Sequence, residues 1–88
     1  MPQIEILRRA REAATLCKLI SDLDRTIAVI KADIDAEESQ HRHRYVTDAK
    51  YPLLARHLRT RRDNLEATVR DLTARLGRIG PDPRAAVA

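Results

Sequence analysis

Apolar residues recur along the first half of the chain at alternating steps of three and four residues. This spacing is typical of an amphipathic helix that packs along one stripe of a seven-residue repeat, with apolar side chains at positions a and d. With Ile6 at a, the register holds to Ile34 without a break in phase, and only Arg9 interrupts it. We call this stripe the first seam: Ile6, Ala13, Leu16, Ile20, Leu23, Ile27, Ile30 and Ile34. It predicts a helix over about residues 3–43.

The first seam turns polar toward its C-terminal end. Glu37, His41 and Arg44 take the next a and d positions. The helix is therefore expected to continue to about residue 43 without burying this face.

A second stripe follows Pro52, again in steps of three and four residues. We call it the second seam: Ala55, Leu58, Arg62, Leu65, Val69, Leu72, Leu76 and Ile79. It predicts a helix over about residues 51–79, in which Pro52 is tolerated because it falls in the first turn. Gly77 and Gly80, followed by prolines, form a stop signal at its end. Residues 81–88 show no periodicity and are expected to form a flexible C-terminal tail.

The two expected helices are joined by a short turn at about residues 44–50, where Thr47 and Asp48 are plausible N-cap residues. A connection this short places consecutive helices side by side in opposite directions. The sequence therefore predicts an all-α fold, an antiparallel, coiled-coil-like two-helix hairpin that forms one domain over residues 1–80.

In such a hairpin, the numbers of residues that face each other add up to a constant. A sum near 92 sets Ile34 against Leu58 at the turn end, and it keeps apolar residues opposite each other along both seams. The one mismatch sets Ile30 against Arg62. There the arginine stem is expected to lie along the seam and to carry its guanidinium group outward.

The composition explains why one hairpin is expected to need a second. The 88 residues include no Phe and no Trp, so aliphatic side chains must build the core. A core of this size is marginal without disulfides, metals or association. We therefore expect two hairpins to pair into a four-helix bundle, as a homodimer.

The net charge is +4, but the charges are segregated along the chain. Residues 22–38 hold six acids against two bases, whereas residues 42–62 are strongly basic. Folding at a sum of 92 brings Glu38, Asp35 and Asp33 close to Arg56 and Arg59. The favoured interpretation is thus an internal charge zipper, which sets register more than it adds stability. The alternative is a basic surface that meets an acidic partner. Its candidate residues, the basic turn, are Arg42, His43, Arg44, Lys50 and Arg56.

Candidates for chemistry are few. His41 and His43 point away from each other on a helix, so we expect no metal site. Cys17 is the only cysteine and is interpreted as a small filler beside the seam, in a reducing, cytoplasmic setting. No nucleophile with a base, glycine-rich phosphate loop or membrane-spanning stretch is found. We therefore expect no enzyme, no cofactor, no small-molecule substrate and no membrane insertion.

Apolar residues outside the seams cluster near the N-terminus, as expected for a helix that contacts more than one neighbour. They form a hypothetical partner interface of Ile4, Leu7, Ala10, Ala14, Cys17 and Leu19. The expected function is a non-catalytic protein–protein interaction module, a small helical adaptor or assembly protein that self-associates and binds another protein. The alternative is an accessory nucleic-acid-binding protein that makes non-specific phosphate contacts through the basic turn and second helix.

Overall fold

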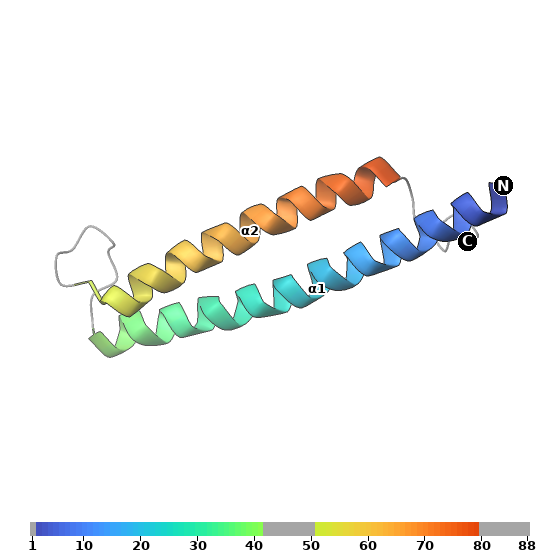
Figure 1. Cartoon of the computed structure of the whole chain (residues 1–88). Helices are drawn as coiled ribbons and strands as arrows, with labels where there is room; N and C mark the ends of the chain where they lie inside the picture. The colour runs from blue at the N-terminus through green and yellow to red at the C-terminus, as the bar shows by residue number, and fades with distance from the viewer. Residues whose placement is uncertain (1, 42–50, 80–88) are drawn as a thin grey trace.

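The computed structural model describes residues 2–41 and 51–79. It contains two α-helices, α1 (Pro2–His41) and α2 (Leu53–Ile79), which pack against each other. Figure 1 shows α2 returning alongside α1, so that the described chain forms a helical hairpin. The prediction of an all-helical hairpin is confirmed. The expected turn at 44–50, with Thr47 and Asp48, and the expected tail at 81–88 lie outside the described residues.

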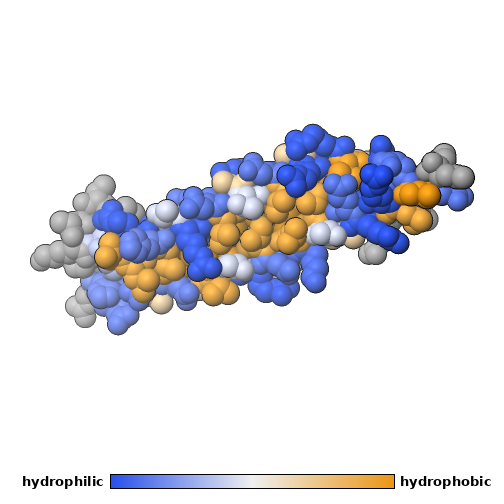
Figure 2. Space-filling model, in the orientation of Figure 1, coloured by the Kyte–Doolittle hydropathy of each residue, from blue (hydrophilic) through white to orange (hydrophobic). Residues whose placement is uncertain are grey.

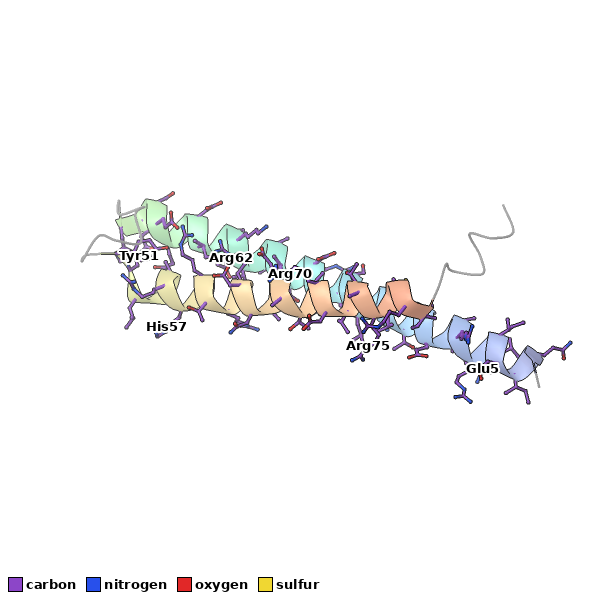
Figure 3. The ribbon with its side chains drawn as sticks, turned by 90° about the horizontal axis from the view of Figure 1, so that it is seen from above. Glu5, Tyr51, His57, Arg62, Arg70 and Arg75 are labelled. Atoms are coloured by element: carbon purple, nitrogen blue, oxygen red, sulfur yellow. The ribbon has the colours of Figure 1, made fainter. Side chains whose placement is uncertain are left out.

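The two helices differ in length, and this changes where the first seam begins. α1 has 40 residues and α2 has 27, a difference of about 20 Å at 1.5 Å per residue. In Figure 3, Glu5 lies beyond the end of α2. Ile6 was expected in the seam, but it is 58% exposed because no described part of α2 reaches it. Burial starts at Ala13, and we call residues 2–12 the N-terminal overhang.

The core of the hairpin is built mainly from the first seam. Its buried apolar residues are Ala13, Leu16, Ile27, Ile30 and Ile34, with Ala55 and Tyr51 from the second half of the chain. Apart from Ala55, the second seam is only half-buried along its whole length. The first seam is therefore covered better by α2 than the second seam is by α1.

Two ion pairs join the helices. Lys31 Nζ lies 3.5 Å from Glu66 Oε1, and Arg59 pairs with Glu38. In both pairs the residue numbers add up to 97, five more than the expected register of 92. Long side chains lean toward the N-terminus of their own helix, and two of them together span this offset of about 7.5 Å.

The start and the end of α2 follow from local backbone chemistry. Pro52 precedes the helix, and its carbonyl oxygen accepts the first helical hydrogen bond from Arg56 N at 3.1 Å. At the other end the helix continues to Ile79, so Gly77 lies inside it rather than stopping it. Gly77 is exposed, and a Cβ added there would meet nothing within 4 Å.

Candidate interaction surfaces

A polar cluster closes the hairpin near the turn, and we call Glu38, Tyr51 and Arg59 the tyrosine cluster. The Tyr51 hydroxyl donates to Glu38 Oε1 at 3.0 Å, and Arg59 Nε donates to the same hydroxyl at 2.6 Å. Arg59 Nη2 donates to Glu38 Oε1 as well. Glu38 is 8% exposed and Tyr51 5%, so these two polar side chains are buried, whereas Arg59 is half-buried. Figure 3 shows Tyr51 at this end of the hairpin.

The electrostatics of the tyrosine cluster keep its arginine charged. Hydrogen bonds to Tyr51 and to Glu38 raise the pKa of Arg59 above its ordinary value. The guanidinium groups of Arg59 and Arg56 also lie over the Tyr51 ring, 5.7 and 5.6 Å from its centre. Cation–π contacts at this distance are attractive. The aromatic ring is thus held by two cations and one carboxylate.

The sequence indicated only part of this cluster. The Glu38–Arg59 pair was expected from the register, whereas the role of Tyr51 was missed. Glu37, not Glu38, was assigned to the next seam position, yet Glu38 is buried and Glu37 is half-buried, 3.3 Å from His41 Nε2. The reason is that Tyr51, before α2 begins, supplies a hydroxyl that satisfies the Glu38 carboxylate. A lone tyrosine beside a proline was the available signal.

The expected charge zipper is present in part. Within the described segments, ion pairs across the hairpin are the Lys31–Glu66 and Glu38–Arg59 pairs. The other pairs join residues of one helix, as in Arg62 with its neighbour Asp63 at 2.9 Å. Arg62 is at a seam position with its side chain 23% exposed, so its stem lies in the seam and its head points outward. Long-range charges are therefore only partly matched within the hairpin.

Four members of the basic turn, Arg42, His43, Arg44 and Lys50, lie outside the described residues. Its one described member, Arg56, is exposed and lies over the Tyr51 ring. Arg56 thus also belongs to the surroundings of the tyrosine cluster.

The expected partner interface is exposed, but its members are spread along α1. Ile4 (63% exposed) and Leu7 (58%) line a hollow of about 380 Å³ together with Arg8 and Arg11. Leu19 is also exposed, about 18 Å further along the helix from Leu7. Of the remaining members Ala14 and Cys17 are exposed and Ala10 is half-buried. The overhang therefore gathers an apolar surface beside two cations.

A second apolar surface lies on the hairpin itself. Figure 2 shows an apolar stripe over the middle of both helices. Half-buried seam residues from this part of the chain are Ile20, Leu23, Leu65, Val69 and Leu72. Contact with only one neighbouring helix leaves part of each side chain in water. This surface was not among the sites proposed from the sequence, although it belongs to the seams.

Within residues 2–41 and 51–79, no group of three or more His, Cys, Asp or Glu residues could hold a metal ion. The free thiol of Cys17 is exposed rather than packed as a filler. In this same part of the chain, neither helix combines the length and apolar character needed to cross a membrane.

Comparison with known proteins gives no relative: no family model, curated protein or solved structure matches the chain.

Proposed function

We propose that this protein is a non-catalytic interaction module, a small helical adaptor or assembly protein of the cytoplasm. In this proposal the hairpin is antiparallel and coiled-coil-like, and two copies pair into a four-helix bundle. The N-terminal overhang then remains for another protein.

The observation that supports the proposal is the incomplete cover of the seams. Seven of the eight second-seam residues are only half-buried, although they are spaced for a helix interface. Aliphatic side chains at a and d positions in four-helix bundles are covered by the facing helices. A second hairpin supplies that cover, and it enlarges a core that is marginal in one chain.

The overhang supports the second half of the proposal. Ile4, Ile6 and Leu7 are each more than half exposed within about one turn of α1. An apolar helix end flanked by Arg8 and Arg11 fits an apolar groove with an acidic rim on another protein.

The test is the oligomeric state. Size-exclusion chromatography with light scattering at micromolar concentration should give twice the 10.0 kDa chain mass. Leu19→Glu should lower the dimer fraction, and Val29→Glu, at an exposed position away from both seams (57% against 45% for Leu19), is the matched control. A fully folded protein that is strictly monomeric at this concentration refutes the self-association.

A further inference from the structure

The hairpin uses one flank of its seams and leaves the other unused. Lys31 and Glu38 each follow a d position of the first seam by one residue. Arg59 and Glu66 do the same in the second seam, and these four residues form the two ion pairs that join α1 to α2. We call them the closed flank. The flank on the other side of each seam is formed by the residues that precede the a positions.

We call that other side the open flank. For the a positions from Ala13 to Ile34 of α1 it consists of Glu12, Leu19, Thr26 and Asp33, and in α2 of Leu54, Arg61, Thr68 and Arg75. All of these side chains are exposed except Thr26, which is half-buried. The open flank carries two exposed large apolar residues, Leu19 at 45% and Leu54 at 53%. It therefore borders the half-covered seams with a surface that is partly apolar.

The charges of the open flank are of opposite sign on the two helices. α1 contributes Glu12 and Asp33, and α2 contributes Arg61 and Arg75. Within the described residues, Asp33 and Arg61 make no ion pair, although their positions lie near the same level of the hairpin. An acidic edge and a basic edge on one molecule are complementary to the same two edges of a second copy.

We infer that a second copy of this chain covers the open flank, with both turns at the same end of the dimer, so that Asp33 of each chain pairs with Arg61 of the other. The inference rests on the proposed self-association and adds its orientation. With both turns at one end, α1 lies between its own α2 and that of the partner. All neighbouring helices are then antiparallel, and the acidic stretch 22–38 lies level with a basic helix on both sides.

The same arrangement covers the seams over their full length. Residues at one height along the first hairpin face residues at the same height along the second. All 27 residues of α2 therefore lie beside a segment of the partner. The two overhangs also project from one end of the dimer, beyond the ends of the α2 helices, where Ile6 of both chains remains open to another protein. With the turns at opposite ends and the α2 helices still matched over their length, Arg61 would instead lie level with about residue 21 of the partner, roughly 18 Å from Asp33.

Exchange of charges between chains tests this pairing. Asp33→Arg and Arg61→Asp each put like charges at both contacts of a homodimer, and we expect each to raise the dimer dissociation constant about tenfold. An equimolar mixture of the two variants contains a heterodimer with both contacts restored. Its dissociation constant should return to that of the unchanged protein, because each reversed charge meets a reversed charge of the other chain.

The control is Asp35→Arg in place of Asp33→Arg. Asp35 is exposed and has the same charge, but it lies outside the open flank. This variant alone should dimerise like the unchanged protein. Its heterodimer with Arg61→Asp keeps one native contact and one like-charged contact, so its dissociation constant should stay above that of the unchanged protein. Restoration in the first mixture only is the expected result.

The outcomes separate the two proposals. An unchanged protein that stays monomeric refutes self-association itself. A stable dimer in which Asp33→Arg has no effect, or in which the first mixture is no tighter than its components, overturns the orientation alone. Pairing within one chain gives the latter result, since a mixture cannot repair it.

Discussion

Replacing Glu38 by Ala tests whether the tyrosine cluster, rather than the polar end of the seam, closes the hairpin. The change removes the acceptor of the Tyr51 hydroxyl and the partner of Arg59. A buried hydroxyl without an acceptor costs about 1–3 kcal/mol. Loss of a fully buried ion pair costs about 3–5 kcal/mol, but Arg59 is 28% exposed and recovers part of its hydration. We therefore expect the free energy of unfolding to fall by about 2 kcal/mol.

The neighbouring Glu37 supplies a matched control. It pairs with His41 one helical turn away, a half-exposed contact of the kind worth about 0.3–0.5 kcal/mol. Glu37→Ala should therefore change the free energy of unfolding by less than about 0.5 kcal/mol. Thermal unfolding followed by circular dichroism gives both values. For a domain of this size, the loss in Glu38→Ala corresponds to roughly 8–16 °C in Tm. All variants must be compared at one protein concentration, because self-association shifts apparent stability.

The pH dependence of stability tests the tyrosine cluster in a second, independent way. Because hydrogen bonds raise the pKa of Arg59, its contribution is complete below the pKa of an unfolded arginine and is lost only as the pH rises through the higher folded value. The stability difference between the unchanged protein and Glu38→Ala should thus persist from about pH 7 to about pH 9. If Glu37→Ala lowers the free energy of unfolding as much as Glu38→Ala does, the tyrosine cluster does not hold the two helices together.

Three further changes test the packing. Gly77→Ala should raise the free energy of unfolding by about 0.5–1 kcal/mol, because the helix continues past an exposed glycine with open space around it; a loss in urea denaturation would contradict this geometry. Arg62→Leu should raise the free energy of unfolding by about 1 kcal/mol, because an aliphatic side chain fills the seam. Unchanged stability would contradict this expectation. Val29→Lys, at a 57% exposed position outside the seams, should leave Tm within about 3 °C, and a larger drop in a thermal melt would indicate cover there.

The parts of the fold that could be predicted are those determined by periodicity. Ile27, Ile30 and Ile34 are buried as their spacing predicts, because helical periodicity selects one face whatever the partner is. The same argument failed at Ile6, since spacing within one helix says nothing about the length of its neighbour. The hairpin was thus predictable from local pattern, whereas the overhang depends on where α2 ends.

The candidate surfaces were less predictable for a different physical reason. The expected partner residues Leu7 and Leu19 are exposed, but periodicity alone could not tell that seven of the eight second-seam residues are only half-buried. Tyr51 was missed because its contacts come from outside any helix. Side chains that bridge between elements depend on three-dimensional distances, which a one-dimensional pattern does not contain.

The placement of the polar links has a consequence for how the hairpin opens. Both ion pairs between α1 and α2 involve residues from the half nearer the turn, together with the buried Tyr51 hydroxyl. In the far half, the described contacts between the helices are aliphatic: Ala13 and Leu16 are buried, whereas Leu72 and Leu76 are only half-buried. Local unfolding begins where such contacts are fewest. The two helices should therefore separate first at the end far from the turn, while the contacts around Tyr51 still hold the other end closed. This opening would move the N-terminal overhang of α1 away from the end of α2.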